Sequence, residues 1–275
     1  MRVVAVTRRP PGVERKTFAR RPAHRPLAGD VVLVDVRGRQ PVAVQLVLPP
    51  RLAPFDAMAA AMGRMHWDDA SNNGPRGGGR LAGFTAPHRT FGWAPPQVLR
   101  QRYATTAAMH DEAALANALS ALGAAVWPWV AQHLPVAAGA HQRAVQAAVA
   151  DRWRLSAGWF TSGIVNRSVA LPYHRDAGNL RGCLSAMVAW RHQVGGGALH
   201  LPEYDTWLAV PDRSLVVFNG ATVLHGVTPL GVRPGGWRYT AVWYVRAGLA
   251  RSAPTWEAEM ARAQLHATSH DHVPA

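Results

Sequence analysis

The stretch that decides the fold is "GCLSAMVAWRHQVGGGALHLPEYDTWLAVPDRSLVVFNG", residues 182–220. It contains four short apolar runs, "GCLSAMVAWR", "GGALHLPE", "TWLAVP" and "SLVVFNG", joined by short links that are mostly polar or contain glycine. Such runs, bounded by turn residues, are typical of β-strands. "GWFTSGIVN" precedes them, and "LHGVTPL" and "RYTAVWYVR" follow. Short strands at this spacing predict a β-barrel or sandwich from about residue 155 onward.

The part of the chain before residue 155 has a different pattern. Residues 30–49 alternate apolar and polar side chains around a polar turn, which predicts a β-hairpin. Residues 54–65, 110–130 and 138–153 show helical spacing, and Pro128 is expected to end the second of these helices. The sequence therefore predicts an α+β protein in which helices support a β-barrel.

The charge of the chain is strongly positive and uneven. The formal net charge is +14 at pH 7 with a pI near 11.4, which points to a polyanionic partner, most often nucleic acid. Seven of these net charges lie in residues 1–25, where Glu14 is the sole acid; a merely solubilising role is the alternative. The basic residues of this segment are Arg2, Arg8, Arg9, Arg15, Lys16, Arg20, Arg21 and Arg25.

Cysteine content and hydropathy limit the compartment. Cys183 is the sole cysteine, which excludes an internal disulfide and a cysteine-based zinc cage. The N-terminus lacks the apolar core of a signal peptide, and we expect no apolar stretch of about 18 residues and hence no membrane partner. We expect a reducing cytoplasm.

A candidate metal site begins in "LPYHRDAGNL", residues 171–180. Alternate side chains of a strand share a face, so His174 and Asp176 are expected to point to the same place. His225 in "FNGATVLHGVTPL" is the best candidate for a third ligand. Two histidines and one carboxylate on one face of an ion are the ligand set of non-haem Fe(II) oxygenases.

A candidate cosubstrate site follows in "GWRYTAVWYV". Arg238 and Thr240 alternate along a predicted strand and should point the same way. A cation and a hydroxyl beside an open-sided iron suit a small acid that chelates the metal at one end and has a carboxylate at the other.

These motifs together resemble the Fe(II)/2-oxoglutarate dioxygenases over about residues 160–245. "HRD", "GGALHLPE", "SLVVFNG" with "LHGVTP", and "RYT" occur in the family's order. Within that superfamily "HRDAGN", "GGALHLPEY" and "FNGATVLHGVTPL" look like the TET/JBP branch, whose bacteriophage members are similar in size, and residues 88–103 also look like a segment of that branch. The resemblance implies a double-stranded β-helix of the jelly-roll or cupin type, and the cytoplasm of a bacterial or phage-infected cell.

The resemblance also implies roles for individual residues. His174, Asp176 and His225 would bind Fe(II), Arg238 would bind the 2-oxoglutarate carboxylate, and Asn179 would contact an extruded base. Strand periodicity alone adds Thr240 to the cosubstrate site. The large insertions and cysteine-rich zinc region of animal TET enzymes are absent from this sequence, so their sequence preferences do not carry over.

The expected reaction is hydroxylation of the methyl group of 5-methylcytosine in DNA, giving 5-hydroxymethylcytosine. A methyl C–H bond has no useful acidity, so iron, 2-oxoglutarate and O2 are needed, and the stacked base must be flipped out to reach the metal. The alternatives are a thymine hydroxylase of the JBP type, a 2-oxoglutarate oxygenase acting on a protein side chain or small molecule, and a DNA-binding module with a decayed, metal-free barrel.

The predicted domain organisation has three parts. Residues 1–29 form a basic N-terminal arm, and residues 30–252 form a single catalytic domain. Within it, residues 50–153 are the helical support and residues 155–248 are the double-stranded β-helix core. Residues 253–275 form a C-terminal helix and tail.

Several polar residues have competing interpretations. His66 and Asp68 form a second His-x-Asp pair, but they sit at a helix end and no strand series follows them. The "HDH" at 270–272 is expected to bind nothing specific, and Asn179 could be a turn residue after Gly178. Asn166 and Arg167 could approach the base or the cosubstrate, although packing or solvent exposure is the alternative. The remaining candidates are interpreted as strand or turn residues: His192, His200, Glu203 and Tyr204.

Overall fold

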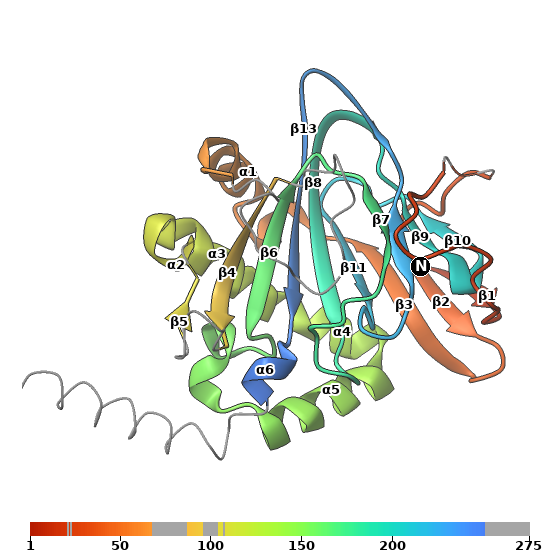
Figure 1. Cartoon of the computed structure of the whole chain (residues 1–275), viewed down its shortest axis with the longest axis horizontal. Coiled ribbons are helices and arrows are strands. Elements are labelled where there is room, and N and C mark those ends of the chain that lie inside the picture. The colour runs from red at the N-terminus through yellow and green to blue at the C-terminus, as the bar shows by residue number, and fades with distance from the viewer. Residues whose placement is uncertain (21, 23, 68–86, 96–103, 107, 251–275) are drawn as a thin grey trace, which may run out of the picture.

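Two β-sheets and a layer of helices make up the part of the chain that the structure describes (Figure 1). The structure is a computed structural model, and it describes residues 1–250 except 21, 23, 68–86, 96–103 and 107. The predicted tail at 253–275, the pair partner Asp68 and the "HDH" at 270–272 lie outside the described residues.

The larger sheet has nine strands in the order β1-β2-β3-β11-β8-β13-β6-β4-β5. Its centre is the long pair β8 and β13, which run antiparallel with Arg238 opposite Arg191. The strands are β1 (Arg2–Val6), β2 (Val31–Asp35), β3 (Gln40–Val47), β4 (His88–Ala94), β5 (Ala104–Thr105), β6 (Ser162–Arg167), β8 (Ser185–Gly196), β11 (Ser214–Phe218) and β13 (Leu230–Tyr244).

The smaller sheet has the order β10-β9-β12-β7 and is antiparallel throughout. From β6 to β13 the chain passes repeatedly between the two sheets, so strands distant in sequence become neighbours. No backbone ladder between described strands closes the sheets into one continuous barrel. The strands are β7 (Leu171–His174), β9 (Leu199–Leu201), β10 (Thr206–Leu208) and β12 (His225–Val227).

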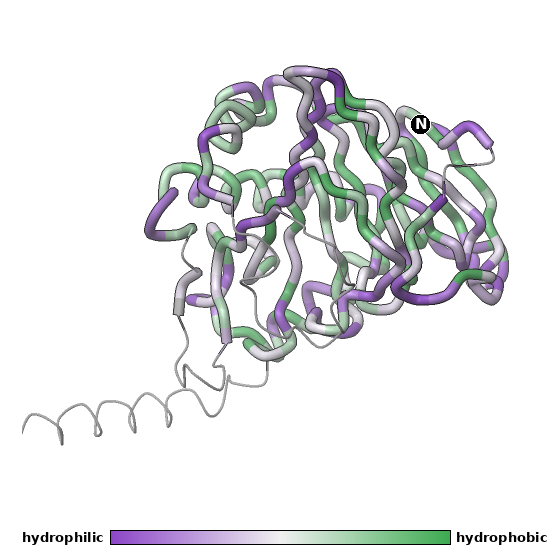
Figure 2. The backbone as a smooth tube through the Cα atoms, turned by 45° about the horizontal axis from the view of Figure 1, so that its top comes forward, coloured by the Kyte–Doolittle hydropathy of each residue, from purple (hydrophilic) through white to green (hydrophobic). Residues whose placement is uncertain are grey.

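The period of two along the central strands divides the core into two layers. On β8, Met187 and Ala189 face the smaller sheet and pack with Leu201 and Leu208, whereas the residues between them face the helices. Both faces of the sheet are therefore covered at its central strands, which explains why the first half of β8 and all of β11 are buried without a solvent-facing side. Apolar residues follow the strands and helices while hydrophilic ones gather in the outer loops (Figure 2).

The helices cover the face of the larger sheet that points away from the smaller one (Figure 1). The second predicted helix, 110–130, is divided ahead of Pro128: α3 (Ala113–Ala125) ends before it, and Pro128 lies in the first turn of α4 (Trp127–His133), where its missing N–H costs nothing. The helices are α1 (Phe55–Arg64), α2 (Ala108–Asp111), α3 (Ala113–Ala125), α4 (Trp127–His133), α5 (Pro135–Ala148) and α6 (Ala247–Ala250).

One contact fixes β13 against α3. The fully buried indole of Trp243 donates a hydrogen bond from Nε1 to the Leu119 carbonyl at 2.9 Å. Gly123 makes room for it, since a Cβ there would lie 2.6 Å from Trp243 Nε1. The helix layer thus holds the strand that carries Arg238 and Thr240.

The stretch Ala113–His133 is strongly apolar. Its 21 residues are long and apolar enough to cross a membrane by length and composition, so the expectation that no such stretch exists was wrong. Half of it is buried, and Leu115, Leu119 and Leu122 pack in the core beneath the larger sheet. Core packing accounts for its composition.

The basic N-terminal segment, residues 1–29, lies along both sheets. Arg2–Val6 pairs in parallel with β2 as the edge strand of the larger sheet. Further on, the Lys16 amide donates to Tyr173 O and the Tyr173 amide donates to Thr17 O, each at 2.8 Å, which lays this segment against β7. The division into an arm and a domain beginning at residue 30 stays a prediction, but the segment shares backbone pairing with the domain.

A buried histidine predicts how stability depends on pH. The His141 ring is fully buried, donates from Nε2 to Trp159 O at 2.8 Å, and accepts from the Leu184 amide at Nδ1 at 2.9 Å. The contact with the Leu184 amide requires the neutral ring, because only an unprotonated Nδ1 can accept, and burial lowers the pKa of His141 to about 4.

Because the unfolded state binds this proton at a pKa of about 6.5, His141 stabilises the fold fully above that pH. We therefore expect protonation of His141 to lower the free energy of unfolding by roughly 3 kcal/mol as the pH falls from about 6.5 to about 4. Urea unfolding at pH 7 and pH 4.5 measures the loss, which should be smaller in His141→Gln. An equal loss in both proteins would contradict the assignment.

Candidate metal centre

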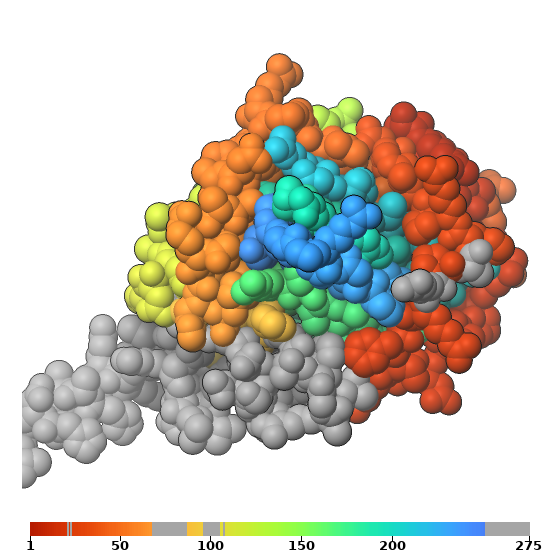
Figure 3. Space-filling model, turned by 90° about the horizontal axis from the view of Figure 1, so that it is seen from above, coloured from red at the N-terminus to blue at the C-terminus, as the bar shows by residue number. Residues whose placement is uncertain are grey.

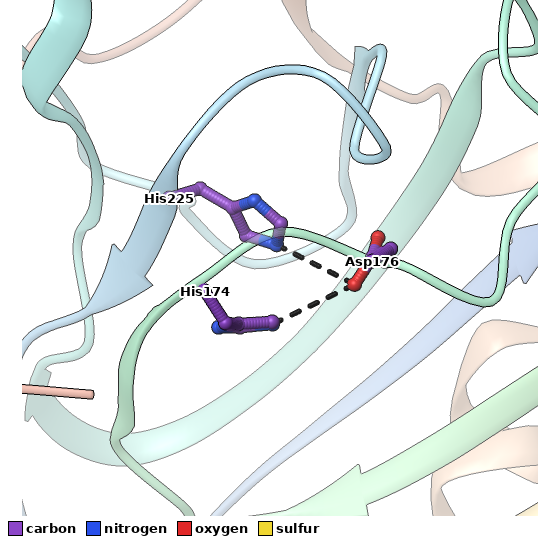
Figure 4. A group of neighbouring side chains, drawn as sticks. All are labelled: His174, Asp176 and His225. Carbon is purple, nitrogen blue, oxygen red and sulfur yellow. Dashed lines mark ion pairs between the residues drawn. The ribbon is translucent and has the colours of Figure 1, made fainter. Parts of the chain in front are cut away.

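Two neighbouring strands of the smaller sheet bring the predicted histidines together. His174 ends β7 and His225 begins β12, and the two residues are directly opposite in the antiparallel pair. Their ring centroids lie 4.2 Å apart, and both rings point toward Asp176 (Figure 4). One strand pair thus brings together two histidines that lie about 50 residues apart in the sequence.

Asp176 completes the group from the loop that follows β7. Its amide donates to Gly220 O at 2.9 Å, which holds the loop against the end of β11. Asp176 Oδ1 then lies 3.6 Å from His174 Nε2 and 3.8 Å from His225 Nε2. All three ligating atoms lie within 4.8 Å of one another.

The tautomers of both rings suit metal binding. His174 Nδ1 lies 2.7 Å from Pro172 O and His225 Nδ1 lies 3.0 Å from Val223 O. A carbonyl oxygen only accepts, so each Nδ1 carries the hydrogen and each Nε2 keeps a lone pair directed at the shared centre. Burial, reinforced by His174, lowers the pKa of His225 to about 4, so this ring is neutral at physiological pH.

The centre is open on one side. The His225 side chain is 9% exposed, whereas Asp176 and His174 are 27% and 35% exposed. Three donors grouped on one side leave the opposite side accessible to small ligands. This arrangement matches a facial site of two histidines and one carboxylate.

Asn179 and two residues that the sequence did not suggest surround the Asp176 carboxylate. Asn179 Nδ2 donates to Asp176 Oδ2 at 3.2 Å and to Ser185 Oγ at 3.1 Å. A Cβ on Gly220 would lie 2.2 Å from Asp176 Oδ2 and 2.8 Å from Ser185 Oγ. The available signal was the glycine closing the apolar run "SLVVFNG", since glycine at a strand end often marks close approach.

Arg238 and Thr240 share the face of β13 that points toward the smaller sheet. The residues between and after them, Tyr239 and Ala241, belong to the core on the helix side. Arg238 and Thr240 are each 3% exposed, and Asn166 Nδ2 on β6 donates to Thr240 Oγ1 at 3.4 Å. The interior between the sheets therefore holds a cation, a hydroxyl and an amide side by side on two paired strands.

Arg238 has the features of an anion receptor. Its Nε and Nη2 are buried and have no hydrogen-bond partner among the described residues. Arg191, opposite it on β8, instead donates to the carbonyl oxygens of Val194, Gly196, Ala209 and Val210. Burial, with a smaller contribution from Arg191, lowers the pKa of Arg238 to about 9. An unpaired buried guanidinium is costly, and a bound carboxylate would satisfy it.

The competing candidates do not join the centre. His66 is exposed, as is Arg167. His192 stacks on Trp237 with ring centroids 5.7 Å apart. His200 is buried, where its Nδ1 contacts the Tyr173 hydroxyl at 2.6 Å.

Sequence comparison places the chain in a family. The profile of the CMD1/TET dioxygenase C-terminal domain matches residues 93–263, more than half of the chain, and the match includes all six predicted site residues. The chain belongs to the CMD1/TET dioxygenase family. It is therefore an enzyme of the 2-oxoglutarate–Fe(II) dioxygenase class, and the family implies Fe(II) and 2-oxoglutarate as its cofactors. No curated protein matches the sequence.

Three solved structures resemble the chain to different degrees. NgTET1 in complex with 5mC DNA is 15% identical, covers 80% of this chain and 78% of its own, and has a TM-score of 0.55. A 2OG-Fe(II) oxygenase family protein from Burkholderia pseudomallei is 13% identical, covers 73% and 84%, and scores 0.45. OsALKBH1 is 14% identical, covers 75% and 98%, and scores 0.44. At this identity the NgTET1 likeness shows the fold alone, and it confirms the predicted α+β class.

Proposed function

We propose that this CMD1/TET family enzyme hydroxylates the 5-methyl group of 5-methylcytosine in DNA. One observation carries the proposal: three ligating atoms converge within 4.8 Å in a protein whose facing sheet buries two nitrogens of Arg238 that have no hydrogen-bond partner among the described residues. We further propose that the two sheets form a double-stranded β-helix, which the repeated passage of the chain between them supports.

The residues present fit an Fe(II) ion. His174 and His225 would bind through Nε2, because each Nδ1–H is committed to a backbone carbonyl. Asp176 would bind through Oδ1, while its Oδ2 accepts from Asn179. Bound iron, with O2 and 2-oxoglutarate, supplies the oxidising power needed to break a methyl C–H bond.

The residues also fit 2-oxoglutarate. Arg238 would hold the carboxylate remote from the metal, because its Nε and Nη2 are buried donors that no described residue satisfies. Thr240, on the same strand face and joined to Asn166, would add a hydroxyl contact. Burial keeps water away from this ion pair, which strengthens it.

A DNA substrate is supported by charge and by likeness. The net charge of +14 favours a polyanion, and the NgTET1 structure with a similar fold holds 5mC DNA. The target base must leave the stack to reach the centre, at a cost of a few kcal/mol that pocket contacts offset. Asn179, next to Asp176, is the residue we propose to contact the extruded base.

Mass spectrometry of nucleosides tests the proposal. DNA containing 5-methylcytosine, incubated with enzyme, Fe(II) and 2-oxoglutarate, should yield 5-hydroxymethylcytosine, and His174→Ala should yield none. Product from thymine instead would identify a JBP-type thymine hydroxylase. Succinate release that depends on peptides or free amino acids, with no dependence on DNA, would overturn the DNA substrate while leaving the iron site in place.

Binding to DNA should depend steeply on salt. Each phosphate neutralised by a basic residue contributes a slope of about −0.9 in a log–log plot of affinity against salt. We expect affinity for a methylated duplex to fall by orders of magnitude between about 50 and 200 mM salt. Arg15→Ala with Arg20→Ala, at two exposed positions of the N-terminal segment, should make the slope shallower. An unchanged slope would remove these residues from the DNA contact.

A further inference from the structure

Glu203 is a buried carboxylate outside the metal centre with an unusually complete set of partners. It lies in the short turn Pro202–Tyr204 after β9, and its side chain is 6% exposed. Oε1 accepts from Arg8 Nη2 at 2.7 Å and from Arg8 Nε at 3.1 Å. Oε2 accepts from the Leu224 amide at 2.7 Å and lies 3.3 Å from Arg175 Nη2.

Two of these partners are chain neighbours of the proposed ligands. Arg175 lies between His174 and Asp176, and Leu224 immediately precedes His225. One carboxylate oxygen therefore joins the two segments that must meet for the three ligating atoms to converge. Arg175 Nε strengthens the link by donating to Thr222 O at 3.0 Å.

The third partner comes from the N-terminal segment. Arg8 contacts Oε1 with two nitrogens, and the next residue, Arg9, donates its amide to Glu203 O at 2.7 Å. Arg8 is thus engaged within the protein, although half of its side chain is exposed. A two-nitrogen contact of this kind fixes geometry as well as charge.

We propose that Glu203 is a positioning residue for the metal centre, and that Arg8 completes this support instead of contacting DNA. The proposal rests on the proposed function for the identity of the centre. Because Glu203 bridges the segments that bear His174, Asp176 and His225, its loss should let the two segments separate. The N-terminal segment then has two functions, one in building the active site and one in attracting DNA.

Metal affinity of the full chain provides the first test. Mn(II) titration, followed by the EPR signal of the free ion, should give a dissociation constant about 10–100-fold weaker in Glu203→Ala than in the wild type. Arg8→Ala should weaken binding in the same direction, and Glu203→Gln should be intermediate. Arg37→Ala, an exposed arginine of the β2–β3 turn, removes the same charge and should bind as the wild type does.

A double variant separates positioning from general charge effects. If Arg8 acts through Glu203, Arg8→Ala should add little to Glu203→Ala, whereas independent effects would add in full. Should Glu203→Ala fail to fold, Glu203→Gln and Arg8→Ala carry the test. Wild-type Mn(II) affinity in those folded variants would overturn the proposal.

Hydrogen exchange of the metal-free proteins distinguishes this inference from the proposed function. Peptides spanning 171–180 and 219–227 should exchange faster in the Glu203 and Arg8 variants than in the wild type or Arg37→Ala. If the wild type fails to bind Mn(II) yet these peptides are loosened in the variants, the metal assignment falls and the positioning role stands. Unchanged exchange would overturn the positioning role.

Discussion

Arg238→Met is expected to remove the response to 2-oxoglutarate while making the free protein more stable. Binding of 2-oxoglutarate should weaken because truncating one partner of a buried charge pair costs about 3 kcal/mol. This cost is equivalent to about a 100-fold higher KM for 2-oxoglutarate. The free protein should become more stable because Arg238 Nε and Nη2 are buried and have no partner in the part of the chain that the structure describes. Replacing such a group by an apolar one stabilises on the order of 1–4 kcal/mol.

Two measurements check this pair of opposite effects. Thermal unfolding without ligands should show a higher Tm for Arg238→Met, and added 2-oxoglutarate with Mn(II) should raise Tm in the wild type much more than in the variant. Arg191→Met is the matched contrast, since Arg191 donates to four backbone carbonyls and its removal should lower Tm. An unchanged KM in Arg238→Met would exclude Arg238 as the carboxylate partner.

Gly220→Ala is expected to disable the centre without touching a proposed ligand. The new Cβ would lie 2.2 Å from Asp176 Oδ2, so the carboxylate must move. Displacement by about 1 Å can cost 100-fold in rate, and we expect kcat/KM to fall by about that factor. Mn(II) affinity should fall in parallel, because the displaced group is itself a proposed ligand.

Gly178→Ala is the control for this variant. Gly178 lies in the same loop as Asp176, and a Cβ there meets nothing within 4 Å. Neither glycine has a positive φ, so space alone distinguishes the two substitutions. Equal losses in both variants would mean that the loop backbone, and not the contact with Asp176, explains the effect.

Arg238→Met and Gly220→Ala change different regions of the folded chain. Seen from above, the hairpin end of β8 and β13 is at the surface between the N-terminal segment and the residues around α1 (Figure 3). Arg238 begins the part of β13 that leads from this end into the core, whereas Asp176 is linked to the start of β8 through Asn179, which donates to both Asp176 Oδ2 and Ser185 Oγ. The two predictions therefore test separate parts of the proposed site.

Much of the fold follows from local pattern. The hairpin at 30–49 and the helix at 54–65 form β2, β3 and α1 close to their expected bounds, and the apolar runs after residue 155 form strands. Side-chain periodicity within a few residues is enough for such predictions. The pattern could not show that Arg2–Val6 would pair with β2, because partner choice between strands depends on packing far along the chain.

The sequence by itself determined the residue types of the centre: His174, Asp176 and His225 in an order and spacing typical of an iron-binding family, with Arg238 after them. Only the tertiary structure decided which polar groups are satisfied. Arg191 and Arg238 are the same residue type on paired strands. Arg191 donates to four carbonyls, whereas Arg238 has two buried donors that find no partner among the described residues. Likewise Glu203 links distant segments because the fold places two arginine side chains and a backbone amide within reach of its buried carboxylate. Hydrogen bonding and burial depend on neighbours from the whole chain, which no local pattern contains.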